Sequence, residues 1–407
     1  MNGLPPVLTA PPPPPKSGSL RRSLAVVLGL CLALFLADAI AACVDALMVA
    51  FFGSHAVSLL CEIISMATMA MAAGVYALIG LSPSVPKRVF LFIPGFYLAT
   101  MLVIFPAAIY FYRQLPEFDL GLSIFQLFLA GGLLYVANRG KGVSWPLVPV
   151  DSLGDRLFSL RHLSIFVLGN IFVLLPLVVV YVFMCSARAV DHFSEGFMAL
   201  HPFGFTVQVR KYVRDDGKVI ELFPMAHVAN ANFYEKVAQT FPTNSLILME
   251  GVSDNQNLLT NKISYKRMAR SLGLAEQKET FSPPSNEVVR ADVDVGVFSA
   301  ETIDFLNLIM AFHTKGVNAE SVIKMTQFEP EPGFEQRLFD DLLRKRNEHL
   351  LEEIHSHLPE SDNIMVPWGV AHMPGIAREI QKSGFHLAES HNYVVISFGG
   401  KGQGESK

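Results

Sequence analysis

Two histidines in this sequence stand where an apolar run gives way to a helix-like segment. His372 follows the run "NIMVPWGVA" and precedes Pro374 by two residues, and His227 follows "VIELFPMA". Proline is favoured in the first turn of a helix, so a helix is expected to begin near Pro374. A histidine side chain can bind a metal ion or transfer a proton near neutral pH. The pattern therefore places two candidate chemical groups at two strand-to-helix junctions.

An acidic residue occupies a third junction of this kind. Glu250 ends the apolar run "SLILME", and Gly251 follows it. In α/β sheets, ligands bind at the carboxyl ends of the strands. We therefore predict that His227, Glu250 and His372 share one site, with Gly369 leaving room for a close approach. A single histidine at a strand end more often makes a structural hydrogen bond, so the prediction depends on the combination.

An arginine gives independent evidence for a site in this part of the chain. The segment 334–358 carries apolar residues at helical spacing, and Arg346 and Asn347 project into the same stripe at about 100° per residue. A buried arginine that lacks its partner costs on the order of 3–5 kcal/mol. We predict that Arg346 pairs with a carboxylate, Glu250 being the leading candidate. The alternative is an arginine at the rim of the core. The stripe consists of Phe339, Leu342, Leu343, Leu350, Leu351, Ile354 and Leu358.

Other constellations are weaker. His349, Glu353 and His357 follow one another at four-residue intervals and could bind a metal, but the H-E-x-x-H arrangement is absent and this flank is polar. A solvated helix face is the favoured interpretation. No G-x-S-x-G motif occurs, so hydrolysis by a Ser-His-Asp triad has no support.

The second half of the chain must supply the strands and helices that hold these residues. Residues 186–407 mix short apolar or alternating runs with helical segments, which is typical of an α/β domain with a mixed sheet. "TVQVRKYV" and "KVIELF" flank the turn "RDDG" and predict a hairpin. "NYVVISF" is expected to be the last strand and to pair back with "FHLAES". Helices are expected over 231–240, 261–272, 299–312, 334–358 and 374–383.

The first half of the chain is far more apolar than a soluble domain. Hydrophobic residues make up 51% and charged residues 17% of the whole sequence, against about 25% charged residues in soluble domains. Five apolar stretches are each near or above the roughly 20 residues that a helix needs to cross a bilayer. They predict an α-helical transmembrane bundle over 23–185. The stretches are 24–52, 58–81, 89–112, 120–138 and 163–184.

Lysine and arginine residues predict the orientation of these spans. They precede the first span and recur in every second connection, whereas the other two connections hold a single arginine between them. Because cytoplasmic loops carry the excess of positive charge, the N-terminus is expected in the cytoplasm and the chain after 185 outside. The proline-rich arm 1–22 and the glycine-rich tail 399–407 are expected to be disordered. The positive residues are Lys16, Arg21, Arg22, Lys87, Arg88, Arg139, Lys141, Arg156 and Arg161.

Three acidic residues lie within or beside the predicted spans. Asp38 and Asp45 are seven residues apart and share one helix face, and Glu62 lies in the second span. Intramembrane acids are costly and often functional. An ion or proton path is one interpretation, and a transporter would follow from it. The favoured interpretation is a polar packing contact, or snorkelling near the surface for Asp45 and Glu62.

Charge and cysteine content exclude several classes of protein. A net charge of −4 and a pI near 6.3 argue against a nucleic-acid partner. All four cysteines lie in or beside the apolar half, so the rest of the chain has neither a disulfide framework nor a thiolate metal site. They are Cys31, Cys43, Cys61 and Cys185.

With these residues assembled, the second half resembles the TraB/GumN-like superfamily, which includes the Tiki proteases. The resemblance covers roughly residues 205–398. "MAHVANANFYEKVAQTFPTNSLILMEG" matches the first family histidine and the acid, "RNEHLLEEI" the Arg-Asn helix, and "GVAHMPGI" the second GxxH motif. "RADVDVGVFS" is similar to the middle of the family domain. The first motif departs from the family by carrying Pro224 in place of glycine, which fixes φ and predicts a different backbone path near His227.

The resemblance implies a TraB-like α/β domain over 186–398 and a membrane-anchored extracytoplasmic hydrolase of the metal-dependent peptidase type. It implies that His227, Glu250 and His372 hold a divalent metal or activate its water. Arg346 would then orient an acid or stabilise an oxyanion. Two imidazoles and a carboxylate suit Mn²⁺, Co²⁺ or Zn²⁺, and a bound metal lowers the pKa of its water towards about 7.

The expected partners are the lipid bilayer and a peptide or protein substrate, with no nucleic acid. The sequence does not indicate an oligomeric state. The alternative function is a non-catalytic membrane protein whose outer TraB-like domain binds a peptide or signal ligand.

Overall fold

The computed structural model describes residues 17–138, 142, 145–260, 265–283, 287–315, 323–325, 327–328 and 330–399. The chain divides into two units, Met1–Cys185 and Ser186–Lys407. We call the first the membrane unit and the second the sheet unit, and each is described by itself.

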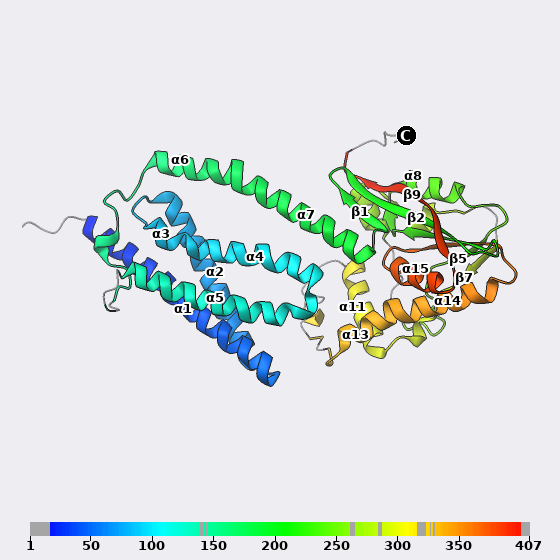
Figure 1. The fold of residues 1–407 in the computed structure, drawn as a ribbon, viewed down its shortest axis with the longest axis horizontal. Helices are drawn as coiled ribbons and strands as arrows, with labels where there is room; N and C mark the ends of the chain where they lie inside the picture. The colour runs from blue at the N-terminus through cyan, green and yellow to red at the C-terminus, as the bar shows by residue number, and fades with distance from the viewer. Residues whose placement is uncertain are drawn as a thin grey trace, which may run out of the picture. The chain divides into compact units, whose positions relative to one another are not determined.

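Long apolar helices form the membrane unit (Figure 1). Five helical stretches of the described chain are long and apolar enough to cross a membrane, so this is an integral membrane protein and the five predicted apolar helices are confirmed. The fifth is longer than the predicted 163–184 because its last helix continues to Ser194. The helices are α1 Ser17–Phe52, α2 Ser58–Leu81, α3 Lys87–Phe90, α4 Phe92–Tyr110, η1 Tyr112–Gln114, α5 Leu115–Ala137, η2 Val150–Ser152, α6 Leu160–Gly169, the π-helical η3 Asn170–Leu174, and α7 Leu175–Ser194.

Apolar side chains lie on both the inner and the outer sides of these helices. Leu32 and Phe35 of α1 are buried in one core with Ile93 of α4. Phe128 of α5 and Phe172 of η3 are among the large apolar residues that remain exposed. A helix that is apolar all round belongs in a membrane or in a deep core, so the exposed residues are those that lipid would cover.

The predicted boundary of the N-terminal arm is wrong. α1 begins at Ser17, so residues 17–22 are helical rather than disordered. Arg21 anchors this end, because its guanidinium donates to the Leu153 carbonyl at 2.8 Å and lies 3.3 Å from Asp155 Oδ1. Parts of the predictions on disorder and orientation lie outside the described residues, namely 1–16, 400–407, Arg139 and Lys141.

A seven-stranded mixed sheet forms the framework of the sheet unit. Its order is β1-β2-β3-β8-β5-β7, and β9 also pairs with β2. The pairs among β1, β2, β3 and β9 are antiparallel, whereas β3, β8, β5 and β7 run parallel. The strands are β1 Met198–His201, β2 Gly204–Val213, β3 Val219–Met225, β5 Leu246–Met249, β7 Glu287–Arg290, β8 Asn363–Gly369 and β9 His386–Ser397, with a separate pair β4 Val228–Ala229 and β6 Ala275–Glu276.

The predicted hairpin is confirmed, and the predicted pairing of the last strand is wrong. β2 and β3 are antiparallel neighbours, with Val213 opposite Val219. "FHLAES" and "NYVVISF" do not form a second hairpin, because β9 runs unbroken through both and pairs with β2 from Gly204 to Val213. The physical reason is that His391 alone separates the two runs, which is shorter than the two-residue loop that a tight hairpin needs.

Side chains that alternate along the central strands build a core on each face of the sheet. Leu248 of β5 packs with Leu350 and Ile376 on one face, whereas Ile247 packs with Tyr234 on the other. The expected helical segments are present, except that 261–264 lie outside the described residues. The helices are α8 Ala231–Gln239, α9 Lys266–Leu272, α10 Gln277–Thr280, η4 Val295–Val297, α11 Ala300–Lys315, α13 Phe334–Phe339, the π-helical η5 Asp340–Arg344, α14 Lys345–His357 and α15 Met373–Lys382.

The π-helical segment η5 interrupts the helix that the sequence predicts over 334–358. It joins α13 to α14 and holds more residues per turn than an α-helix does. The side chains of α13 are therefore rotated about the helix axis relative to those of α14, compared with one continuous α-helix. Leu350 and Ile354 are buried, as the apolar stripe predicts, whereas Phe339 is 58% exposed. The predicted apolar stripe is therefore confirmed for α14, whereas the predicted burial of Phe339 is wrong.

Candidate functional site

The carboxyl ends of four parallel strands supply the candidate site. Met225 of β3 pairs with Gly369 of β8, and Met249 of β5 pairs with Arg290 of β7. Parallel neighbours end at the same edge of a sheet, so residues that follow them are brought together from distant parts of the sequence. The residues that follow these strands are His227, Glu250, Asp292 and His372.

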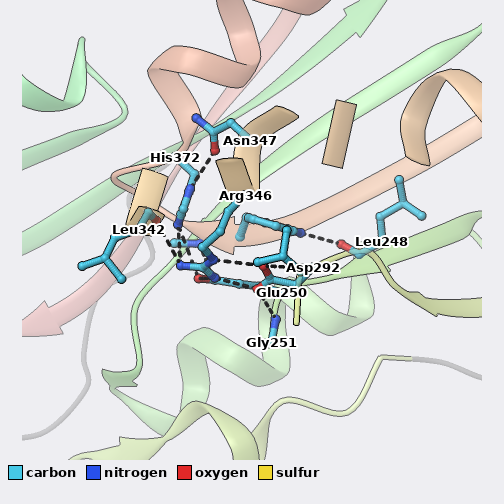
Figure 2. Close-up of polar contacts among 11 residues, drawn as sticks. Leu248, Glu250, Gly251, Asp292, Leu342, Arg346, Asn347 and His372 are labelled. Atoms are coloured by element: carbon cyan, nitrogen blue, oxygen red, sulfur yellow. Dashed lines mark hydrogen bonds and ion pairs between the residues drawn. The ribbon is translucent and has the colours of Figure 1, made fainter. Parts of the chain in front are cut away.

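Arg346 of α14 joins three of these residues in one cluster (Figure 2). Its Nη2 donates to Glu250 Oε1 at 2.7 Å and to Asp292 Oδ2 at 2.6 Å, and its Nε donates to Asp292 Oδ1 at 2.9 Å. Its Nη1 lies 3.1 Å from His372 Nε2. The predicted pairing of Arg346 with Glu250 is confirmed, and Asp292 adds a second carboxylate.

Every N–H of this guanidinium has an acceptor. Arginine has five such donors. Four contact Glu250, Asp292 and His372, and the fifth, on Nη1, faces the Leu342 carbonyl at 3.4 Å. The Arg346 side chain is only 13% exposed. Burial opposes its charge, but the bonds to Asp292 and Glu250 outweigh burial and raise the pKa of Arg346 above its ordinary value. The cation is therefore fixed in one orientation.

His372 is the uncharged member of the cluster. Its Nδ1 lies 2.7 Å from Asn347 Oδ1, and an amide oxygen only accepts, so we assign the ring proton to Nδ1. Nε2 then presents its lone pair to Arg346. Burial, followed by the positive charge of Arg346, lowers the pKa of His372 to about 4. The imidazole is therefore neutral at pH 7, in the form that can accept a proton or bind a metal.

Glu250 keeps part of its hydrogen-bonding capacity free. Its Oε1 accepts from Arg346 and lies 3.6 Å from His372 Nε2, and its Oε2 accepts from the Gly369 N–H at 2.6 Å. A Cβ added to Gly369 would lie 3.3 Å from Oε2, so this glycine lets the Glu250 carboxylate come close to the strand end, while the approach of a metal or substrate stays a prediction. A carboxylate offers about four lone-pair sites, and the two bonds to Arg346 and Gly369 leave room for a water or substrate donor.

His227 stands apart from the cluster. It is exposed, and its ring stacks on Tyr265 with ring centres 4.9 Å apart and planes at 10°. Burial, followed by the negative charges of Glu250 and Glu276, raises the pKa of Tyr265. The stacked pair therefore lies close enough to Glu250 for the charge of this carboxylate to shift the pKa of Tyr265. Within the described part of the chain, no hydrogen bond or ion pair joins His227 to Glu250 or His372.

Pro224, the departure from the family pattern, is accommodated inside a strand. It is buried in β3 opposite Trp368 of β8. β2 pairs with β3 only as far as Leu222, so the missing N–H of Pro224 lies beyond that ladder. The Ala226 carbonyl that follows accepts from the Tyr234 hydroxyl at 2.6 Å.

The predicted metal ligands do not form a ligand set in this arrangement. The guanidinium of Arg346 contacts both His372 Nε2 and Glu250 Oε1, and His227 faces Tyr265 instead. Across the described ranges, no group of three or more His, Cys, Asp or Glu residues is placed to hold a metal ion. The three predicted ligands as they stand are therefore not grouped around one position that fits a divalent ion.

The second candidate metal cluster lies on one side of α14. Glu353 lies 4.0 Å from His349 Nε2 and 3.5 Å from His357 Nε2, and all three side chains are partly exposed. They form weak helical pairs at four-residue spacing, which agrees with the solvated face that the sequence favours.

Asp292 is the cluster residue that sequence reasoning missed. It follows the strand "EVVR", whose Val288 is 51% exposed, so the run lacks the apolar signal of a buried strand. The Asp292 side chain itself is fully buried. The signal that could have found it is its position two residues after a strand, in the stretch "RADVD" that already carries the family resemblance.

Comparison of the chain with protein-family models, with curated proteins and with solved structures gave no match.

Proposed function

We propose that this chain is a membrane-anchored hydrolase of the TraB/GumN-like type, with its reaction site at the cluster of Glu250, Arg346 and His372. The main support is a neutral, buried His372 beside a carboxylate and a buried cation at the ends of parallel strands. Titratable groups perturbed in this way gather at functional sites. The resemblance supports a peptide or protein as the substrate class.

Glu250 is the group best suited to act on a water molecule, because it retains free lone pairs and 10% side-chain exposure. It would take a proton from the water as the water oxygen bonds to the substrate carbonyl carbon. The same proton would then pass to the leaving amine as the C–N bond breaks. General acid–base catalysis of this kind contributes about 10²–10⁴-fold.

Arg346 would orient both Glu250 and His372, which it contacts directly. Its weakest contact is the one at 3.4 Å to the Leu342 carbonyl. That N–H is therefore the donor for which a developing oxyanion would compete most easily with the present acceptor, and one such donor typically supplies about 3–4 kcal/mol.

A test of hydrolysis uses the full chain in detergent and a mixed library of quenched fluorescent peptides. Glu250→Gln keeps the shape of the side chain and removes the base, so the cleavage rate should fall by about 100-fold or more. Glu353→Gln, on the partly exposed side of α14, is the matched control and should retain the wild-type rate. Absence of cleavage by the wild type, or equal rates for the three proteins, would contradict the proposal.

A divalent cofactor, Mn²⁺, Co²⁺ or Zn²⁺, remains a prediction. Calorimetric titration of the full chain with each ion decides it, using wild type, His372→Ala and the control His357→Ala. Loss of about one bound ion in His372→Ala alone would place a metal at the cluster. Equal binding by all three proteins would remove His372 from any metal site.

The alternative, a ligand-binding protein without catalysis, has one observation in its favour. All five N–H groups of Arg346 are already satisfied inside the protein, as expected of a network that holds a binding surface in shape. In that case library peptides would bind to the chain and be recovered uncut.

The proposal places the sheet unit outside the cytoplasm, on the lysine and arginine pattern of the sequence. A reporter fused after Phe398 tests this placement. Activity of a reporter that works only in the cytoplasm would overturn it.

A further inference from the structure

The membrane unit contains a buried carboxylate on one helix that side chains from three other helices contact. Asp38 of α1 is 1% exposed. Its Oδ2 accepts from the Tyr97 hydroxyl of α4 at 2.6 Å and from Gln126 Nε2 of α5 at 2.7 Å. Its Oδ1 accepts from the Ser65 hydroxyl of α2. Three helices thus each direct one polar side chain at a single acid on the fourth.

All three donors to Asp38 are uncharged. Within the described part of the chain, no lysine, arginine or histidine forms an ion pair with it. A carboxylate buried without a cation tends to take up a proton instead. The site suits both forms: three donors satisfy the ionised carboxylate. In the protonated form, the new O–H can donate to Ser65 Oγ while Tyr97 and Gln126 keep their bonds to Oδ2.

A line of polar groups leads from Asp38 to the turn between α1 and α2. A second pair of the same kind as Asp38–Ser65 lies seven residues later on α1 and seven residues earlier on α2. There the Ser58 hydroxyl donates to Asp45 Oδ1 at 2.7 Å. Ser58 Oγ also lies 3.4 Å from Nδ1 of the exposed His55 in the turn. The two pairs are about 10 Å apart along the helix axis, from a rise of 1.5 Å per residue.

The thiol of Cys61 lies between the two Asp–Ser pairs. It interacts with the Ser65 hydroxyl and lies in the field of both Asp38 and Asp45. The other direction along α1 offers no polar route, since Phe35, Leu32 and Leu28 belong to the hydrophobic core of the unit.

We propose that Asp38 is a proton-binding site, loaded from the α1–α2 turn through the line His55, Asp45–Ser58, Cys61 and Ser65. A proton from water at the turn ends on Asp38 Oδ1, and the site changes from one negative charge to none. The titratable groups that face this site from the packed elements are Cys31 and Asp45 on α1, Cys61 and Glu62 on α2, and Tyr97 on α4; α5 contributes the uncharged Gln126.

This assignment goes beyond a polar packing contact. Packing alone would be served by an asparagine, whose Oδ1 can accept from Tyr97 and Gln126 and whose Nδ2 can donate to Ser65 Oγ, without the cost of a charge in a membrane. An ionisable residue inside a membrane, with partners for both protonation states and a polar route to one surface, is the arrangement used by proton relays.

Infrared difference spectroscopy of the full chain in lipid vesicles tests the site. We expect a carboxylic-acid C=O band that appears as the pH is lowered and that is absent in Asp38→Asn. Tyr97→Phe removes one donor to the ionised form, so its band should appear at a higher pH than in the wild type. A band that persists in Asp38→Asn, or a wild-type spectrum without a titrating band, would overturn the proposal.

The route is tested by the rate at which this band shifts when H₂O is exchanged for D₂O. Cys61→Val interrupts the line and should slow the exchange by at least tenfold. Cys31→Val, on the apolar side of Asp38, is the matched control and should exchange at the wild-type rate. Equal slowing by the two variants, or by neither, would contradict loading from the α1–α2 turn.

Discussion

The two units bury carboxylates in opposite ways. In the sheet unit, Glu250 and Asp292 share the positive charge of Arg346, and His372 beside them is kept neutral. In the membrane unit, Asp38 receives only uncharged donors. The first network is bound together by charge, and the second is held by hydrogen bonds alone.

The two networks are therefore expected to respond differently to the loss of a charge and to the uptake of a proton. A network with an internal cation is hard to open, since removing any charged member leaves the others uncompensated in a buried place. A network without a cation can gain or lose one proton by turning a hydroxyl. The sheet unit is therefore expected to lose stability when a charged side chain of its cluster is replaced, whereas loss of the Asp38 charge should cost the membrane unit little.

The largest effect is expected from Arg346→Met. It leaves two buried carboxylates without a cation, so the free energy of unfolding of the sheet unit should fall by about 3–5 kcal/mol. Denaturant unfolding in detergent measures this in a Trp145→Phe background, where Trp368 is the remaining tryptophan and its ring centre lies 5.4 Å from the guanidinium carbon.

Arg344→Met is the matched control for this prediction. Arg344 is two residues away on the same helical stretch and pairs with Asp340 and Glu348 at the surface. Exposed pairs of this kind contribute little, so its unfolding curve should overlay that of the wild type. Similar losses in both variants would show that Arg346 is not a buried charge.

The next largest effect on stability is expected from the protonation of His372. The pKa of His372 is about 4 in the folded chain and about 6.5 when unfolded. Below pH 6.5 the unfolded chain takes up the proton first, so stability falls as the pH is lowered from 6.5 towards 4, by about 3 kcal/mol in total. Unfolding curves at several pH values should show this slope in the wild type and a shallower one in His372→Gln. The control His386→Gln, at an exposed position of β9, should keep the wild-type slope.

A direct comparison of the two networks comes from paired isosteric changes. Asp292→Asn removes a charge-assisted bond to Arg346 and should cost about 1.5–3 kcal/mol. Asp38→Asn keeps an oxygen that can accept from Tyr97 and Gln126, so its loss should be under about 1 kcal/mol. Thermal unfolding of both variants in the same detergent measures the ranking. The reverse order would remove the distinction between the two networks.

A smaller effect than that of Asp292→Asn is expected at Gly369. In Gly369→Ala the new methyl group would meet Glu250 Oε2 at 3.3 Å, and crowding of this size costs about 1 kcal/mol. Gly399→Ala is the control, since nothing lies within 4 Å of a Cβ there. Thermal unfolding that does not distinguish the two variants would show that Glu250 can move away freely.

The sequence predicts the spans, the hairpin and the inward position of Arg346 because each depends on a local signal. Span length, the turn "RDDG" and the phase of α14 are all visible in short windows. The path of β9 is different. Its partner β2 lies far earlier in the chain, with Gly204 opposite Ser397 and Val213 opposite His386, and only the short connection at His391 hints at it.

The composition of the candidate site was predicted only in part, for a related reason. Glu250 and His372 follow apolar strands that are easy to recognise, whereas Asp292 follows an exposed edge strand. His227 has the same sequence setting as His372, but its ring stacks on Tyr265. The direction that a side chain takes after a strand depends on neighbours that a single sequence does not reveal.

The π turn of η5 has an evolutionary consequence. Because it holds one residue more than an α turn would, deleting one residue from Asp340–Arg344 could restore a plain α-helix. That deletion would rotate α13 by about 100° relative to α14 and leave Arg346 and Leu350 facing the sheet. Descendants of this gene could therefore lose or regain a codon here and change the outer face of α13, while the buried cation stays in place.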